Sequence, residues 1–196
     1  MVALVAGPSR RDQIVAAVLD LVRSEGWPAI SMRPVAERVG ITATALYRHF
    51  EDKQALVDAA LEAATDALMV RFQEASHRAP AGEGRLWAGL EEVRRFAVDE
   101  PHLYAFIFFS VDTSAVRPPP DSLADHRLID ELENYVAAWM NDAGMTREAV
   151  EVASVVAAQA HGLVLLWRQG RFEGPEDFAD FYRKAFRTTL AGVGNQ

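Results

Sequence analysis

The residues best suited to chemistry lie in one short stretch, residues 40–56, which reads GITATALYRHFEDKQAL. The stretch begins with a glycine and small residues, and hydrogen-bond donors then gather at Tyr47, Arg48, His49 and Lys53. A core helix would spread large apolar residues along one stripe, whereas a solvent-exposed helix would carry many charges. Neither pattern is present. We therefore expect the small residues to let a helix backbone approach another surface closely, and the donors to hold that surface.

Enzyme chemistry is the first alternative, and the sequence offers little for it. The chain has no cysteine, which excludes a disulfide framework, a zinc ribbon and a cysteine nucleophile. Its five histidines show no metal-binding spacing, and neither a P-loop nor a G-x-S-x-G motif is present. The sequence predicts a protein that is not an enzyme and has no catalytic site, metal site or cofactor.

Charge is distributed unevenly along the chain. Residues 1–55 contain seven Lys and Arg against six Asp and Glu, a net charge of +1. The remaining residues contain 13 Lys and Arg against 22 Asp and Glu, a net charge of -9. The two segments together give the formal net charge of -8. The N-terminal segment is thus the part of the chain where a polyanion could bind, and this asymmetry permits DNA binding without demonstrating it.

Helical periodicity and capping signals place the elements around this stretch. Ser9 to Asp12 has the form of a capping box, followed by apolar residues at helical spacing to Gly26. Ser31 is expected to cap a second helix that ends at Gly40, and Thr42 a third that ends near Phe50. Further helices are expected over residues 51–77, 86–97, 102–109, 128–139 and 147–169 and after residue 175, with a loop at 117–122. No segment alternates with period two, so we predict an all-α fold.

The second and third helices have the proportions of a helix-turn-helix, whose second helix enters the major groove of DNA. Apolar residues on both helices are expected to lock them together: Val35, Ala36, Val39, Ile41, Leu46 and Phe50. The first turn of the third helix, which has small side chains, would then approach the major groove. The hydrogen-bond donors that follow it would bind the DNA backbone.

The span from about Ile14 to Leu56 resembles the DNA-binding domain of the TetR family of transcriptional regulators. The family pattern G-[IV]-x-x-x-x-L-Y-x-H-F-x-x-K-x-x-L is matched without a gap from Gly40 to Leu56. The resemblance implies a three-helix helix-turn-helix DNA-binding domain over residues 9–55. An α-helical effector-binding and dimerisation domain over residues 56–196 would follow it.

The resemblance also implies which residues contact DNA. Base edges would be met by Ala43, Thr44, Ala45 and Arg48. Phosphates would be met by Ser31, Arg33, Tyr47, His49 and Lys53, with Thr42 counted among the DNA-binding residues. Arg48 is the best candidate for sequence recognition, because a guanidinium that bonds two acceptors of guanine discriminates by roughly 1 to 3 kcal/mol. Two alternatives stay open: Tyr47 could cover the apolar core, and Arg48 could be a solvated charge. Pro34 departs from the family pattern and disfavours helical geometry at Arg33.

The last two helices are expected to form a homodimer interface, as they do in the family. One helix offers a stripe of small residues, and the other an aromatic stripe. The predicted interface residues are Ala153, Ala157, Ala160, Val164, Phe178, Phe181, Tyr182 and Phe186. The alternative is that both stripes face the core of their own subunit.

The middle helices contain more aromatic side chains than a tight helical core requires, and the family encloses an effector pocket in this region. The predicted pocket residues are Trp87, Phe96, Tyr104, Phe108, Trp139 and His161. Ordinary core packing is the alternative for each aromatic residue, and a buried, hydrogen-bonded histidine is the alternative for His161. The effector would be a small, apolar or aromatic molecule.

Taken together, the sequence and the resemblance predict a ligand-responsive regulator, a repressor that binds a palindromic operator in double-stranded DNA as a homodimer. The effector would release it through a tilt of the fourth helix. The apolar residues 150–167 include Glu151, Gln159 and His161, which favours a buried helix over a membrane span. The N-terminal MVALVAGPSRR is expected to be a disordered tail and not a secretory signal. The absence of cysteine fits a reducing cytoplasm, so a cytoplasmic protein is predicted. An architectural DNA-binding protein without a sensor and an activator remain alternatives.

Overall fold

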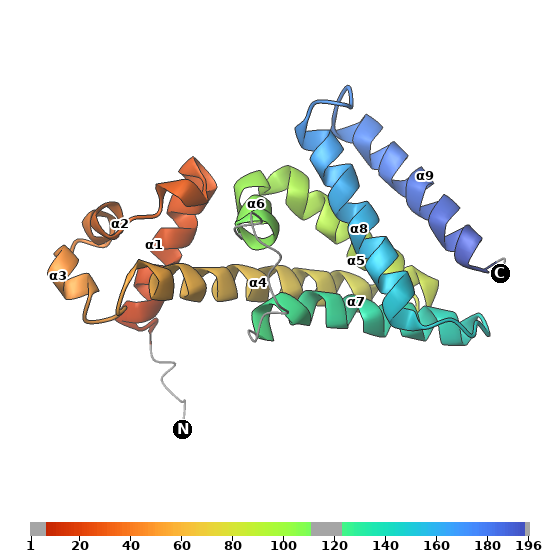
Figure 1. Cartoon of the computed structure of the whole chain (residues 1–196), viewed down its shortest axis with the longest axis horizontal. Helices are drawn as coiled ribbons and strands as arrows, with labels where there is room; N and C mark the ends of the chain where they lie inside the picture. Colours follow the sequence, from red (N-terminus) through yellow and green to blue (C-terminus); the bar gives the residue numbers. More distant parts are fainter. Residues whose placement is uncertain (1–6, 111–122, 195–196) are drawn as a thin grey trace. The chain divides into compact units, whose positions relative to one another are not determined.

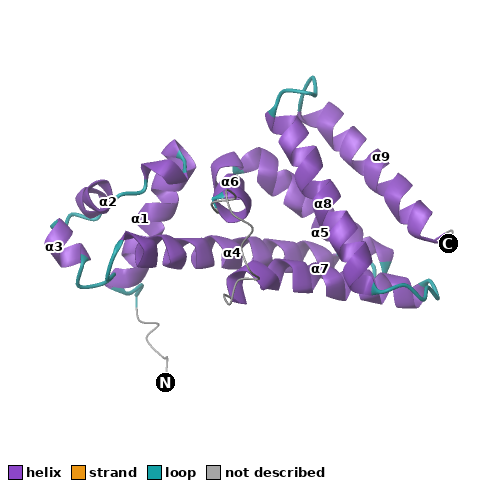
Figure 2. Ribbon diagram, in the orientation of Figure 1, coloured by secondary structure: helices purple, strands orange, loops and turns teal. Residues whose placement is uncertain are grey.

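The structure, a computed structural model, describes residues 7–110 and 123–194, with residues 123–126 and 194 as backbone only. The first six residues of the predicted tail and the predicted loop at 117–122 lie outside this range. Within the described range all regular elements are helices, which confirms the predicted all-α class (Figure 2). Their bounds are α1 Arg10–Glu25, the 3-10 helix η1 Trp27–Ala29, α2 Met32–Arg38, α3 Ala43–Leu46, α4 Lys53–Arg78, α5 Glu83–Asp99, α6 Pro101–Phe109, α7 Leu123–Asp142, α8 Ala149–Arg168 and α9 Pro175–Gly194.

Local capping explains where the first helix begins. The Ser9 hydroxyl accepts a hydrogen bond from the Asp12 amide at 3.2 Å, and the Asp12 carboxylate accepts one from the Ser9 amide at 2.9 Å. This is the predicted capping box, and hydrogen bonding to the Ser9 side chain and to the Ser9 amide lowers the pKa of the Asp12 carboxyl.

Helix α3 is shorter than predicted, because it ends at Leu46 and not near Phe50. After Tyr47, two amides bond to carbonyls only three residues back, Arg48 to Ala45 at 3.2 Å and His49 to Leu46 at 2.9 Å. This tighter hydrogen-bond pattern converts the end of the helix into a turn.

The chain divides into two compact units by contacts between its residues. The first comprises α1, η1, α2, α3, the part of α4 up to Ala67, and α6. The second comprises α4 from Leu68 onward with α5, α7, α8 and α9. The boundary predicted at residue 56 therefore lies inside a continuous helix, and α6 is grouped with the N-terminal helices.

The core of the first unit is built from α1 and the apolar faces of the helix-turn-helix. Val35, Ala36, Leu46 and Phe50 are buried, as predicted, while Val39 and Ile41 are only half-buried. Helix α6 packs against α1 and η1, and His102 Nδ1 lies 2.9 Å from the Arg23 carbonyl oxygen. Helix α2 packs against both α1 and α3.

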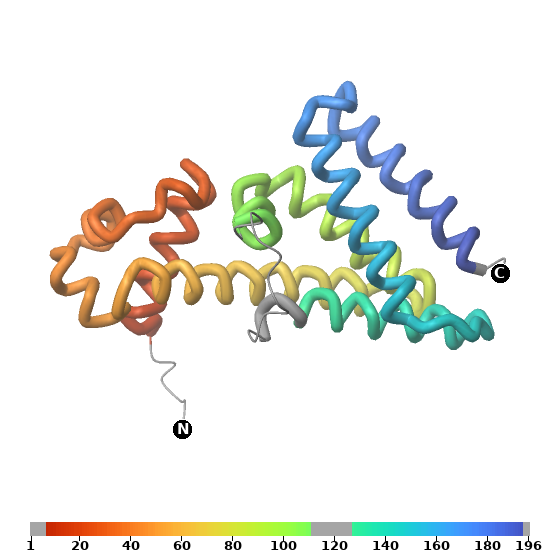
Figure 3. Tube along the Cα trace, viewed as in Figure 1, coloured from red at the N-terminus to blue at the C-terminus, as the bar shows by residue number. Residues whose placement is uncertain are grey.

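The second unit is organised around α8, which packs against α7, α5 and α9, with α9 running antiparallel beside it (Figures 1 and 3). Aromatic rings fill the space between the helices: Phe178 stacks on Trp167 with centroids 5.3 Å apart, and Tyr182 lies 4.7 Å from Phe186. The Tyr182 hydroxyl donates a hydrogen bond to the Leu90 carbonyl at 3.1 Å, which ties α9 to α5.

The Phe72 side chain of α4 packs closely against α5 at Gly89. A Cβ atom placed there would lie 2.5 Å from the Phe72 ring and 2.9 Å from the Ser76 hydroxyl. One turn further, Arg71 forms an ion pair with the nearly buried Glu92 at 2.6 Å. These two contacts join the C-terminal half of α4 to α5 within the second unit.

Candidate nucleic-acid interface

The turn between α2 and α3 is closed by Gly40, whose φ of +69° lies in the left-handed region. The Ile41 amide donates to the Ala36 carbonyl at 3.0 Å, and the Gly40 amide to the Glu37 carbonyl at 3.2 Å. This pair of bonds is a Schellman motif, which satisfies the last carbonyls of α2 and redirects the chain.

Thr42 sets the start of α3. Its backbone is extended, and its hydroxyl accepts a hydrogen bond from the Ala45 amide at 3.1 Å. The cap satisfies one of the free amides of the first turn and leaves small side chains along its leading edge.

The side chains predicted to contact DNA are largely accessible. Ser31, Arg33, Thr42, Thr44, Tyr47, Arg48, His49 and Lys53 are exposed, whereas Ala43 and Ala45 are half-buried. Tyr47 is 52% exposed, so it does not cover the apolar core, and that alternative is removed. The base contact of Arg48 stays a prediction.

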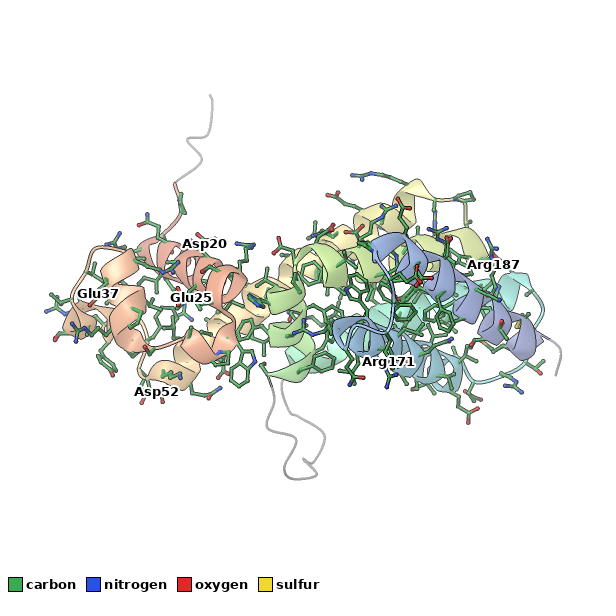
Figure 4. All side chains as sticks on the ribbon, turned by 90° about the horizontal axis from the view of Figure 1, so that it is seen from above. Asp20, Glu25, Glu37, Asp52, Arg171 and Arg187 are labelled. Atoms are coloured by element: carbon green, nitrogen blue, oxygen red, sulfur yellow. The ribbon has the colours of Figure 1, made fainter. Side chains whose placement is uncertain are left out.

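At the start of α2 the expected Ser31 cap is absent and Arg33 has a partner in its own helix, while the phosphate contacts of both residues stay predictions. Ser31 stands at the N-cap position, but its hydroxyl makes no capping hydrogen bond. Arg33 donates to Glu37 at 2.9 Å, and this hydrogen bond raises the pKa of the Arg33 guanidinium. The hydrogen bond between Arg33 and Glu37, which is labelled in Figure 4, would have to break before Arg33 could bind a phosphate.

Sequence reasoning missed two residues that shape this surface. Arg10 donates to the Val39 carbonyl at 2.8 Å, and Arg11 donates to the His49 carbonyl at 3.1 Å. The signal in the sequence was their position in the first turn of α1, where the helix dipole disfavours positive charge.

The predicted effector residues are divided between the two units. Tyr104 and Phe108, whose ring centroids are 4.7 Å apart, belong to α6 in the first unit. The other four, Trp87, Phe96, Trp139 and His161, belong to the second unit. Phe96, Tyr104 and Trp139 are buried, and burial lowers the pKa of His161.

Two open grooves of the second unit have volumes of about 470 and 410 Å³. Charged residues dominate both, including Arg94, Asp99 and Arg183 in the larger and Arg71, Glu92 and Arg95 in the smaller. None of the six predicted pocket residues lines either groove. The effector pocket therefore stays a prediction.

The predicted dimer residues require a correction. Six of them lie in the core of the subunit, with at most 4% of the residue exposed, so they have no surface to offer a partner. They are Ala153, Ala160, Val164, Phe178, Tyr182 and Phe186. Ala157 is half-buried, and Phe181 is 47% exposed. The prediction chose the faces of α8 and α9 that pack within the subunit.

The opposite face of α8 is apolar and uncovered. Val155 is 56% exposed, and Leu165 and Leu166 are similarly accessible. Among the described residues, α8 is the one helix long and apolar enough to cross a membrane. Only 33% of its most apolar 18 residues are buried. The prediction of a buried helix thus holds for one face alone.

Among residues 7–110 and 127–193, no three His, Asp or Glu side chains gather closely enough to hold a metal ion. The groups that dominate the described surface of the helix-turn-helix are hydrogen-bond donors, and they point to an anionic partner.

Comparison with known proteins identifies the family. A family model described as "Bacterial regulatory proteins, tetR family" matches residues 14–60, and "Tetracyclin repressor-like, C-terminal domain" matches residues 86–189, more than half of the chain. The chain belongs to the TetR family. This confirms the resemblance seen in the sequence.

Curated relatives match over part of the chain. Nucleoid occlusion factor SlmA of Marinobacter nauticus is 39% identical over 66 residues, 34% of each chain. Tetracycline repressor protein class C of Escherichia coli is 39% identical over 54 residues, 28% of this chain and 25% of the repressor. The matches thus span about a third or less of these relatives.

Solved structures of the same fold cover more than nine-tenths of the chain. A protein of unknown function from Rhodococcus sp. RHA1 aligns over 98% of this chain and 100% of its own, with a TM-score of 0.81 and 22% identity. FadR of Bacillus subtilis, solved in complex with stearoyl-CoA, aligns over 92% and 98%, with a TM-score of 0.69 and 10% identity. These likenesses establish the fold of a TetR-family regulator.

Proposed function

We propose that this TetR-family chain is a ligand-responsive transcriptional repressor that acts in the cytoplasm without catalysing a reaction. It binds a palindromic operator in double-stranded DNA as a homodimer and is released by a small, apolar or aromatic effector. The observation that carries the proposal is the helix-turn-helix geometry: a Thr42-capped helix follows a Schellman turn, and exposed donors follow that helix.

Helix α3 enters the major groove with its first turn leading. Ala43, Thr44 and Ala45 lie along that leading turn, where small side chains allow close approach to the bases. Arg48 is exposed one turn further on and bonds guanine, while Tyr47 holds phosphate oxygens. Sequence preference then depends chiefly on Arg48.

A second copy of the chain covers the uncovered face of α8 and the neighbouring part of α9. Val155, Leu165, Leu166 and Phe181 supply apolar surface that a subunit alone leaves in water. An isologous contact through this face produces a two-fold dimer, and paired recognition helices then meet half-sites about 34 to 36 Å apart.

The effector acts through a difference in affinity between two arrangements of the dimer. Helix α4 belongs to both compact units, so a tilt of this helix changes the separation of the two recognition helices. FadR of Bacillus subtilis shares this fold and was solved with stearoyl-CoA, which supports a ligand-binding role for the fold without naming the ligand of this chain.

Selection of bound duplexes from random-sequence DNA tests the proposal, with the wild type, Arg48→Ala and the control Arg78→Ala. Arg78 is exposed and pairs with Glu74 on its own helix. We expect a palindromic site from the wild type and the control, and relaxed preference at one position per half-site from Arg48→Ala. Unchanged preference would remove Arg48 from base recognition. Binding without sequence preference would favour an architectural DNA-binding protein.

A further inference from the structure

Two adjacent arginines occupy an unfavourable place at the start of α1. Arg10 and Arg11 lie in its first turn, where the positive end of the helix dipole repels cations by several tenths of a kcal/mol. Within α1 the partner of Arg10 is Gln13, at 2.8 Å. Arg11 also interacts electrostatically with Asp12 in the same turn, and both arginines contact the helix-turn-helix.

Arg11 reaches across 38 positions of the sequence to the turn that follows α3. Its guanidinium donates to the His49 carbonyl at 3.1 Å, and its carbon Cζ lies 4.3 Å from the centre of the Phe50 ring. Phe50 is buried, so the guanidinium covers the outer face of a core residue. The hydrogen bond fixes the His49 carbonyl, and the stacking fixes the Phe50 ring of the next residue.

Arg10 makes a matching contact with the other helix. It donates at 2.8 Å to the carbonyl of Val39, the C-cap residue of α2. Among the described backbone hydrogen bonds, none ends on the carbonyl of Val39 or of His49. The first turn of α1 thus satisfies one open carbonyl beyond the end of each helix of the helix-turn-helix.

The segment that Arg11 holds contains the donors proposed to bind DNA. Tyr47, Arg48 and His49 lie in the hydrogen-bonded turn after the four-residue helix α3, which is too short to hold its own shape. Because Arg11 fixes the His49 carbonyl in the free protein, the turn has less conformational entropy left to lose when it binds DNA.

We propose that Arg11 is a positioning residue for DNA recognition, which orders the turn from Tyr47 to Phe50 before DNA arrives; this role rests on the proposed function. The competing role for an exposed arginine is direct contact with a phosphate. The two roles differ in salt dependence, because loss of a phosphate contact lowers the slope of log K against log salt by about one.

The test compares the wild type with Arg11→Lys, Arg11→Gln and the control Arg78→Gln. Backbone amide exchange at residues 47–50 is measured in the free protein, and the affinity for the duplex selected by the wild type is measured from 50 to 200 mM salt. Circular dichroism and thermal unfolding show that each variant is folded. A lysine keeps the charge but lacks the planar fork that stacks and donates together.

Both Arg11 variants are expected to speed amide exchange at residues 47–50 and to weaken duplex binding by about tenfold, with an unchanged salt slope. Arg78→Gln should change neither property. Unchanged amide exchange at residues 47–50 in the Arg11 variants would overturn the proposal. It would also be overturned if Arg11→Lys bound the duplex with wild-type affinity while Arg11→Gln reduced the slope of log K against log salt by about one. If the wild type selects no duplex, the proposed function fails, while amide exchange still decides whether Arg11 orders the turn.

Discussion

The hydroxyl of Thr42 determines where the recognition helix begins, because it accepts the amide of Ala45. Helix α3 spans only Ala43–Leu46, so a frayed first turn leaves little of it. We expect Thr42→Ala to lower the free energy of unfolding by about 1 kcal/mol and to weaken operator binding, whereas Thr42→Ser keeps both. Urea unfolding and duplex titration measure the two effects. Equal stability of Thr42→Ala and Thr42→Ser would show that the cap contributes nothing.

His161 makes stability depend on pH. Burial lowers its pKa below the ordinary value of 6.5, so the unfolded chain takes up a proton before the folded chain does. Stability is therefore greatest while His161 is neutral and falls as the pH drops below 6.5. We expect His161→Gln to lose less stability than the wild type between pH 7.5 and 5.5 in urea unfolding. The other histidines are common to both proteins, and an equal loss would contradict the assignment.

At the scale of elements, the contact between α4 and α5 depends on the absence of a side chain at Gly89. An added methyl group would overlap the Phe72 ring, which is itself buried. We expect Gly89→Ala to destabilise the protein by about 1 to 3 kcal/mol. Gly192→Ala is the matched control, because nothing lies within 4 Å of a Cβ at that exposed helical position and helix propensity favours alanine. Equal stability of the two variants would show that α4 and α5 separate easily.

Most of the elements could be predicted from the sequence because their signals are local. The capping box at Ser9 and the cap at Thr42 depend on neighbours three residues away, and both are confirmed. The early end of α3 could not be predicted, since Arg11, which contacts the turn at His49 and Phe50, lies 38 positions from His49 in the sequence. The same distance concealed Arg11 as a contact of His49.

The faces of α8 and α9 show what helical periodicity leaves open. Both faces of α8 are rich in apolar residues, so its pattern fits a core helix and an interface helix equally well. Packing against α7 and α9 decides that Ala153 and Val164 point inward and Val155 outward. The apolar stripe of α8 was predicted correctly, but it packs against helices of the same subunit and not against a second subunit.

At the scale of the whole molecule, the uncovered face of α8 predicts association. The double variant Val155→Glu with Leu166→Glu places two charges on this face, and we expect it to sediment as a folded monomer with at least a tenfold loss of operator affinity. The control is Val70→Glu, an equally exposed valine on α4, which should remain dimeric. A dimeric double variant would place the interface elsewhere.

The number of chains on one operator tests the central claim most directly. Sedimentation equilibrium of the wild type with the selected duplex, at about 50 mM salt, gives this number without assumptions about the effector. The account predicts two chains on one palindromic duplex, since two symmetric recognition helices occupy adjacent turns of the major groove. A single chain on the duplex, or no binding to any duplex at this ionic strength, would contradict it.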